Sequence, residues 1–167
     1  MESDGRSDAI EIRKYGSEDA IATLTVFLSA VTETAAGDYS PEQIAAWSRS
    51  GQRDLSEWER RRTGLNTYVA VVDGNVAGFS DVSAEGHIDM MFVSPRQGRR
   101  GVGRTLLSFL EGRARGTGAS RLSADVSITA RPFFDAHGFV AEVEQHPLSG
   151  GVRMTNFHMV KDLLPDR

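Results

Sequence analysis

From Ile10 onward, the chain switches between the two-residue hydrophobic period of strands and the longer period of helices. Apolar and polar residues alternate over 10–15, which predicts a half-buried strand. Ser17 has the character of a helix start, and apolar residues follow it at helical spacing. These apolar positions are Ile21, Leu24, Phe27, Leu28 and Val31. The opening of the chain is therefore predicted to be one strand followed by one helix.

A second helix is predicted after the break at 37–39. Ser40 has the character of an N-cap, Pro41 suits the first helical position, and Gln43 completes a capping box. The polar stretch 52–64 is expected to hold a further short helix that carries Leu55 and Trp58. Three strands are then predicted, at 66–72, 76–82 and 86–93, and the first two are joined by an Asp-Gly-Asn turn typical of hairpins.

The second half of the chain continues the alternation. A helix is predicted over 101–115, a strand over 121–126, a short helix over 131–137 ended by Gly138, and closing antiparallel strands over 140–145 and 152–160. This order predicts an α/β fold with one domain, 9–165, built on a mixed, mostly antiparallel sheet flanked by helices, with a central β-α-β crossover. Residues 1–8 are expected to form a disordered tail.

Composition narrows the class of protein. The 167 residues include 40% apolar and 25% charged residues, as in an average globular domain. The absence of cysteine excludes cysteine-ligated metal sites, disulfides and a cysteine nucleophile, and no histidine pattern suggests a metal. No uninterrupted run of 18 apolar residues and no export signal are found, so we expect a cytoplasmic protein without a membrane span.

The net charge of −4 argues against a general binder of nucleic acid or membranes, yet one segment is strongly basic. Between Arg96 and Arg115 there are six arginines and a single acid, Glu111. A predicted strand enters a glycine-rich turn there and a helix leaves it, which directs backbone N–H groups toward one point. The arrangement predicts an anion site, and the narrower stretch 96–104 is its expected centre.

Three known phosphate-binding patterns have features in common with this turn. A dinucleotide fingerprint requires a third glycine, but Leu106 stands at that position. A Walker A loop matches 98–105 except that Arg104 replaces the lysine, so a nucleotide-binding loop remains a minor alternative. The third pattern fits best: Val93-Ser94-Pro95 followed by Gly101-Val102-Gly103 and a leucine-bearing helix resembles the acetyl-CoA signature of the GNAT superfamily of acyl-CoA N-acyltransferases. Gly98 stands where the family usually has glutamine or arginine.

The resemblance covers most of the chain. The segment 130–139, with its Gly138-Phe139 ending, is similar to a second GNAT signature, while 39–44 with Trp47 and 155–159 are similar to a poorly characterised bacterial branch. The resemblance implies a GNAT fold and acetyl-CoA as cosubstrate. The residues that it implies for CoA binding are Met91, Phe92, Val93, Gly98, Arg99, Arg100, Gly101, Val102, Gly103, Arg104, Thr105, Ser127, Arg131 and Phe134.

Acyl transfer requires a base for the attacking amine and benefits from a proton for the departing thiolate. His87 and Asp89 are expected on one strand face, close to the acyl group if Met91 and Val93 lie along the pantetheine as the resemblance implies. Either residue, or a water held by them, is the candidate base; the alternative is an ordinary polar strand end. Many relatives have a thiolate-protonating tyrosine at the position of Phe134. Either the thiolate leaves without a dedicated donor, or another group such as Tyr39 or His137 takes the place of the tyrosine.

The sequence therefore predicts an N-acetyltransferase that moves the acetyl group directly to a primary amine of a small molecule or peptide within a ternary complex. No metal is expected, and a homodimer through the C-terminal edge strands is left open. The alternative from another class is a non-catalytic CoA-binding or sensing module on the same fold, which the missing tyrosine donor suggests.

Overall fold

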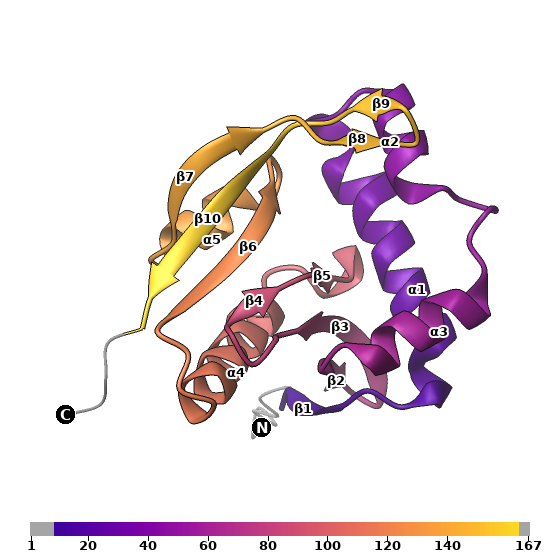
Figure 1. The fold of residues 1–167 in the computed structure, drawn as a ribbon. Coiled ribbons are helices and arrows are strands. Elements are labelled where there is room, and N and C mark those ends of the chain that lie inside the picture. Colours follow the sequence, from indigo (N-terminus) through magenta and orange to yellow (C-terminus); the bar gives the residue numbers. More distant parts are fainter. Residues whose placement is uncertain (1–8, 164–167) are drawn as a thin grey trace, which may run out of the picture.

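A computed structural model describes residues 9–163 of the chain, and these form two four-stranded sheets that meet at a central helix (Figure 1). The helices are α1 (Ala20–Ser29), α2 (Pro41–Ser48), α3 (Leu55–Gly64), α4 (Val102–Gly116) and α5 (Arg131–Ala136). The strands are β1 (Glu11–Lys14), β2 (Thr67–Val72), β3 (Asn75–Asp81), β4 (His87–Ile88), β5 (Met91–Val93), β6 (Arg121–Ser127), β7 (Val140–Gln145), β8 (Leu148–Ser149), β9 (Val152–Arg153) and β10 (Asn156–Asp162). The predicted tail at 1–8 lies outside the described residues.

The first sheet has the order β1-β2-β3-β5 and is antiparallel throughout. Helices α1 and α3 cover one face, where Phe27, Trp58 and Phe79 form the centre of an aromatic core. Helix α4 covers the other face with Val102 and Leu106. Because helices cover this sheet on both faces, β2 carries apolar residues on both of its faces.

The second sheet has the order β4-β6-β10-β7, and its β4–β6 pair is parallel. Helix α4 connects the β4–β5 segment to β6, which confirms the predicted β-α-β crossover. Leu110 of α4, Phe134 of α5 and Met159 of β10 pack in one buried cluster beneath this sheet. The α/β class and the mostly antiparallel pairing are thus as predicted.

Two predicted strands are broken in the structure. The strand expected over 86–93 ends at Ile88 and restarts at Met91, and its two pieces belong to different sheets. The strand expected over 152–160 is split into β9 and β10, and β9 pairs with β8 in a small hairpin that the sequence pattern did not predict. Figure 1 shows this hairpin reaching over to α2, where Gln43 Nε2 donates to the Arg153 carbonyl at 3.0 Å.

The first helical run extends beyond α1. A π-helical turn, Ala30–Thr34, and a 3-10 turn, Ala35–Gly37, continue it to residue 37. The run Ser17–Gly37, with a mean hydropathy of 1.4, is long and apolar enough to cross a membrane by length and composition alone. Buried core helices meet the same criteria, and Phe27 and Val31 of this run are 0% exposed within the aromatic core.

Gly86 permits β4 to lie against β6. Its φ of +94° is a left-handed conformation, and a Cβ at this position would lie 2.1 Å from the Arg121 carbonyl oxygen. Its own carbonyl accepts the Ser123 N–H at 2.9 Å, which starts the parallel pairing. A side chain at Gly86 would therefore meet both backbone strain and a direct clash with the neighbouring strand.

We expect Gly86→Ala to lower the free energy of unfolding by about 3 kcal/mol or more, because strain and overpacking add. Gly74→Ala is the matched control, since Gly74 has a φ of +79° but no atom within 4 Å of the added Cβ. The control should lose only about 1 kcal/mol. Urea denaturation of the two variants measures the difference, and equal losses would contradict the clash with β6.

Candidate functional site

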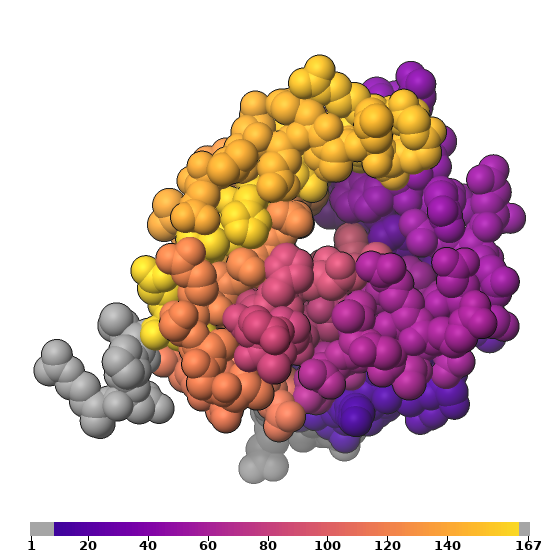
Figure 2. Space-filling model, in the orientation of Figure 1, coloured from indigo at the N-terminus to yellow at the C-terminus, as the bar shows by residue number. Residues whose placement is uncertain are grey.

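A cleft opens where the chain passes from the second sheet to the first. β4 pairs with the start of β6, whereas β5 pairs with β3, so the two segments diverge after Ile88. A cavity of about 300 Å³ lies between them, and Figure 2 shows the molecule hollowed at this point. Most of its lining is apolar, with Met91, Val93, Ala124, Val126, Ala130, Phe133 and Phe134 among the residues. The break in the predicted strand is thus what creates the cleft.

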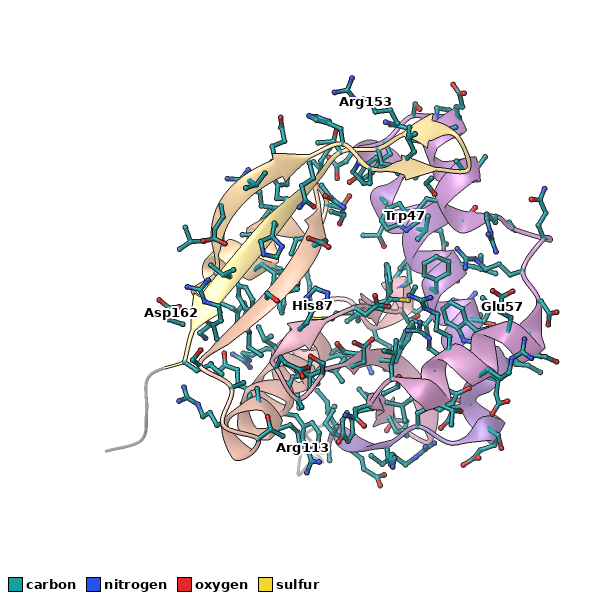
Figure 3. All side chains as sticks on the ribbon, viewed as in Figure 1. Trp47, Glu57, His87, Arg113, Arg153 and Asp162 are labelled. Atoms are coloured by element: carbon teal, nitrogen blue, oxygen red, sulfur yellow. The ribbon has the colours of Figure 1, made fainter. Side chains whose placement is uncertain are left out.

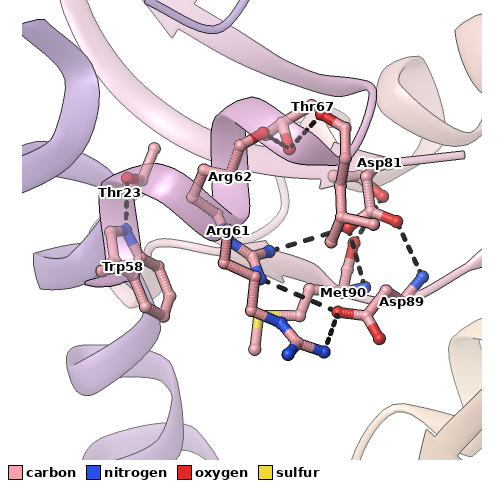
Figure 4. Close-up of polar contacts among 10 residues, drawn as sticks. Thr23, Trp58, Arg61, Arg62, Thr67, Asp81, Asp89 and Met90 are labelled. Atoms are coloured by element: carbon pink, nitrogen blue, oxygen red, sulfur yellow. Dashed lines mark hydrogen bonds and ion pairs between the residues drawn. The ribbon is translucent and has the colours of Figure 1, made fainter. Parts of the chain in front are cut away.

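The side chain of Asp81 holds the two backbone N–H groups at the break. Its Oδ1 accepts from Asp89 N at 2.8 Å, and its Oδ2 accepts from Met90 N at 3.1 Å (Figure 4). The Met90 carbonyl accepts the Ser80 hydroxyl at 2.7 Å. In a regular strand these backbone groups would pair with a neighbouring strand, so the Asp81 carboxylate replaces the ladder at this point.

Arg62 from α3 lies beside this carboxylate and is 0% exposed. Its Nη1 is 3.7 Å from Asp81 Oδ2, its Nη2 is 3.7 Å from Asp89 Oδ2, and its guanidinium lies over the Trp58 ring. Burial lowers the pKa of Arg62 and raises the pKa of Asp81 to about 6. Loss of water dominates both shifts. Arg62 has no direct hydrogen bond to offset it, and for Asp81 it outweighs the two backbone hydrogen bonds that favour the ionised form.

Asp89 projects from the break toward the cavities. Arg61 Nη2 and Arg62 Nη2 each lie 3.7 Å from its Oδ2, and the side chain is 31% exposed. Two further cavities adjoin the cleft, and only Trp47, Asp89 and Met90 line all three cavities described. Figure 3 shows Trp47 extending from α2 toward the opening between the sheets. The structure therefore places Asp89 where the cavities meet.

His87, the other predicted base, occupies a different environment. Its Nδ1 is 2.9 Å from Ser123 Oγ, and its backbone N–H donates to Ser83 Oγ at 3.0 Å. It lines none of the three cavities. His87 and Asp89 therefore do not share one continuous strand, because β4 ends at Ile88 between them, and only Asp89 lines the cavities.

Tyr39 lies between the ends of β6 and β10. Its hydroxyl donates to the Thr155 carbonyl at 2.6 Å and accepts from Ile128 N at 3.0 Å, and burial raises its pKa. His137, the alternative proton donor, has its Nδ1 2.8 Å from the Phe133 carbonyl oxygen. Tyr39 lines a cavity of about 220 Å³ with Trp47, whereas its proton is held by a carbonyl.

The glycine turn leads directly into α4. Arg99 has a φ of +67° and Gly101, the N-cap, has a φ of +81°. No side chain caps the helix, and the first bond in its ladder runs from Thr105 N to the Gly101 carbonyl. The N–H groups of Val102, Gly103 and Arg104 precede that bond, so they are available to an external anion. Arg96, Arg99, Arg100 and Arg104 are exposed around the turn.

Two further predicted CoA-binding residues, Ser127 and Phe134, line the same cleft, and Arg131 follows Ala130 of its wall in the sequence. Ser127 Oγ accepts from Ala130 N at 3.1 Å, and Arg131 lies over the Phe157 ring with its Nε 3.6 Å from Asp135. Phe134 lines the cleft but is only 4% exposed, in edge contact with Phe133 and Phe139. The site thus joins a basic, N–H-rich end to an apolar channel, which fits a long ligand with phosphates at one end and an apolar arm.

A family model for the acetyltransferase (GNAT) domain matches residues 35–161, which include every candidate site residue named above. The chain belongs to the GNAT family of acetyltransferases. It is accordingly an acetyl-CoA-dependent N-acyltransferase.

Individual relatives agree with the family. The chain is 39% identical over 150 residues to a protein named uncharacterized N-acetyltransferase YafP from Escherichia coli K12, covering 90% of this chain and 94% of that one. A crystal structure described as a GCN5-related N-acetyltransferase, Aminotransferase, Class-II, from Rhodopseudomonas palustris superposes with a TM-score of 0.87 at 35% identity, covering 92% and 95% of the two chains. The PaiA N-acetyltransferase from Thermoplasma acidophilum, solved with coenzyme A, gives 0.72 at 25% identity, covering 93% and 99%.

Several residues of this GNAT site were missed by sequence reasoning. Asp81 and Arg62 were absorbed into a predicted strand and a polar stretch expected to hold a helix, and Trp47, which lines the cleft, was named only as part of the family resemblance. A polar residue at the end of an apolar strand is the only signal that could have drawn attention to Asp81. Among the described residues no group of three or more histidine and acidic side chains is arranged to hold a metal.

The raised pKa of Asp81 predicts a pH-dependent stability. Between the ordinary carboxyl value near 4 and the folded value of about 6, the unfolded chain releases the Asp81 proton while the folded chain keeps it. The free energy of unfolding should therefore fall through this window as the pH rises, by up to about 3 kcal/mol. Asp81→Asn cannot titrate, so its denaturation curves in urea at pH 4, 5, 6 and 7 should lack this component. Parallel pH profiles for the two proteins would contradict the burial of a titrating carboxyl.

Proposed function

We propose that the protein transfers the acetyl group of acetyl-CoA directly to a primary amine, with both substrates bound at once. The observation that carries this proposal is the position of Asp89 where the apolar cleft meets two further cavities. The cleft provides a place for the thioester, and the other cavities provide a place for an acceptor. An acyl-enzyme on cysteine is not available to this chain, which has no cysteine.

The basic turn is the proposed site of the CoA phosphates. The backbone N–H groups at the start of α4 supply donors without side-chain flexibility, and the positive end of the helix dipole adds to the attraction. Arg99 and Arg104 are exposed beside these donors and supply charge. The apolar walls from Met91, Val93 and Phe133 suit the pantetheine arm, and Ser127 offers a hydroxyl near its polar groups.

Asp89 is the proposed base. Bound acetyl-CoA supplies an activated acyl group as a thioester. The ammonium form of the acceptor first gives one proton to the Asp89 carboxylate, directly or through water. The free amine nitrogen then bonds to the acetyl carbonyl carbon while the carbon–sulfur bond breaks and its electron pair leaves with sulfur. The second proton lost from the nitrogen passes to the departing thiolate or to water. Arg61 and Arg62 at 3.7 Å keep the carboxylate oriented toward the cavities.

Phe134 and Tyr39 do not supply a free proton for the departing thiolate. Phe134 has no proton to give, and the Tyr39 proton is held by the Thr155 carbonyl. We propose that the thiolate departs without a dedicated side-chain donor. The same observation favours a second function, a non-catalytic CoA-binding module, which predicts CoA binding without thiol release for any amine.

We expect Asp89→Asn to lower kcat/KM by about 100-fold at pH 7, because the variant cannot accept the ammonium proton. Thiol release from acetyl-CoA with a panel of primary amines measures the effect. The defect should shrink as the pH approaches the pKa of the acceptor amine, since the free amine then needs no base. Asp73→Asn, in the exposed β2–β3 turn, is the matched control. An unchanged rate for Asp89→Asn would overturn the assignment of the base.

The phosphate site is tested by binding. Arg99→Gln and Arg104→Gln should each weaken CoA binding by about 3- to 10-fold, and the loss should be greater in low salt than in high salt. Arg121→Gln makes the same change of charge at an exposed pair with Asp162 and should leave the Kd unchanged. Calorimetric titration with CoA gives the constants; similar losses for all three variants would point to a nonspecific charge effect instead.

A further inference from the structure

A second cavity next to the cleft is lined by an unusual number of arginines. It has a volume of about 360 Å³ and meets the cleft at Trp47, Asp89 and Met90. Four guanidinium groups line it, those of Arg49, Arg53, Arg61 and Arg62. The acids in its lining are Asp54, Glu57 and Asp89. An acceptor whose amine lies at Asp89 would place its remaining atoms in this arginine-lined cavity or in the cavity beside Tyr39.

Some of the acidic side chains in the arginine-lined cavity already interact with other groups of the protein. Asp54 caps α3, since its Oδ1 accepts from Ser56 N at 2.8 Å and Glu57 N at 3.3 Å. Asp89 stands at the junction with the cleft, where the proposed function uses it. Glu57 is exposed on α3 (Figure 3). The lining therefore has one more arginine than acids, and two of its three acids lie at an end of the cavity or on its exposed rim.

Arg62 is the buried member of this group of arginines. It is 0% exposed, and none of its three side-chain nitrogens has a hydrogen-bond partner among the described residues. The Asp81 and Asp89 carboxylates lie 3.7 Å away, within range of charge attraction but beyond a hydrogen bond. A buried guanidinium with unmet donors attracts an anion strongly, because little water screens its charge.

Arg53 and Arg61 complete the anion-binding wall. Arg53 Nε donates to the Ser48 carbonyl at 2.7 Å and Nη2 to the Trp47 carbonyl at 2.9 Å, and its guanidinium lies 4.5 Å from the centre of the Phe27 ring. These contacts fix its plane against the cavity. Arg61 is 65% exposed at the mouth and shares Asp89 with Arg62. A carboxylate placed here would meet both a rigid guanidinium and an adaptable one.

The third cavity has the opposite character. Its lining includes the carboxylates of Asp89 and Asp125, together with Ser127 and Asn156, and contains no arginine or lysine. Asn156 Oδ1 is buried without a hydrogen-bond partner. Oxygen acceptors and the rings of Tyr39 and Trp47 suit an ammonium group. An acceptor spanning the junction would thus find acid on one side of Asp89 and arginine on the other.

We propose that the acceptor is an amino acid or a similar primary amine that carries a carboxylate. Its amine lies at Asp89, and its carboxylate lies in the arginine-lined cavity against Arg53 and Arg61, with the charge of the buried Arg62 behind them. The proposal rests on the proposed acetyl transfer and names the substrate class of the same site.

The first test compares matched acceptors. Amino acids are paired with their primary carboxamides, which lack the negative charge and have a lower amine pKa. Thiol release from acetyl-CoA is measured for each pair, and kcat/KM is expressed per free amine. The carboxylate-bearing member of the preferred pair should have a kcat/KM at least about 10-fold higher. Equal or faster turnover of the carboxamides would overturn the substrate class while leaving the transferase function intact.

The second test uses variants of α3. Arg61→Gln should raise the ratio of the KM for the amino acid to the KM for its carboxamide by about 5- to 10-fold, because any effect that Arg61 exerts through Asp89 is common to both acceptors. Arg60→Gln removes the same charge from the adjacent residue, which is exposed and does not line the cavity, and should leave both constants unchanged. Arg62 is left intact because its removal would strand the buried Asp81.

A binding measurement separates this inference from the proposed function. The N-acetylated amino acid and its carboxamide are titrated calorimetrically into the protein without CoA. The N-acetylated amino acid should bind more tightly, and Arg61→Gln should remove most of the difference. If no amine releases thiol, the transfer proposal fails, and this titration still decides whether the cavity selects a carboxylate. Equal binding of the two ligands would overturn that selection.

Discussion

The two hydrogen bonds that the Asp81 carboxylate accepts from Asp89 N and Met90 N determine the architecture of the site. Backbone N–H groups cannot remain unpaired in a buried environment, and a regular ladder would have paired them with a neighbouring strand. By satisfying both groups with one side chain, the protein lets the strand leave one sheet and join the other. The cleft lies in the angle between the two pieces, so a single buried carboxylate makes room for a ligand in an otherwise packed α/β domain.

The buried Asp81 carboxylate lies beside a cation, and the same cation also lies beside the partly exposed Asp89. Arg62 lies 3.7 Å from both Asp81 and Asp89, so it links the carboxylate that shapes the cleft to the carboxylate that faces the cavities. The Trp58 ring beneath Arg62 is fixed by its own hydrogen bond from Nε1 to Thr23 Oγ1 at 3.0 Å (Figure 4). Helices α1 and α3 thereby support the geometry of Asp89 although neither contributes to the glycine turn.

Local signals made most elements of the fold predictable. The capping box at Ser40 and Gln43 is present as expected, and the apolar stripe of α4 packs through Val102, Leu106 and Leu110. The glycine turn was recognisable because phosphate loops need particular residues at fixed positions. Periodicity could not reveal the break after Ile88, because the alternation of side chains continues through it and the cause is a residue on another strand.

Local sequence patterns also identified some residues of the candidate site and could not identify others. Asp89 was selected because it lies two residues before Met91, and the break in the strand does not separate these two residues. His87 was selected by the same rule, but β4 turns it toward Ser123 in the second sheet. The arginine-lined cavity combines residues from α2, α3 and the break, and their convergence depends on helix packing that no local pattern encodes.

Selectivity for a charged acceptor in such a site depends on how far each charged side chain of the protein lies from water. Arg61, at 65% exposed, contributes a charge that salt screens, whereas Arg62 contributes one that salt scarcely reaches. Arg61 and Arg62 also lie 3.7 Å from the Asp89 carboxylate, so the position of that carboxylate depends on the same two side chains. The arginines that would attract a carboxylate on the acceptor are thus also the arginines that would orient the base toward its amine.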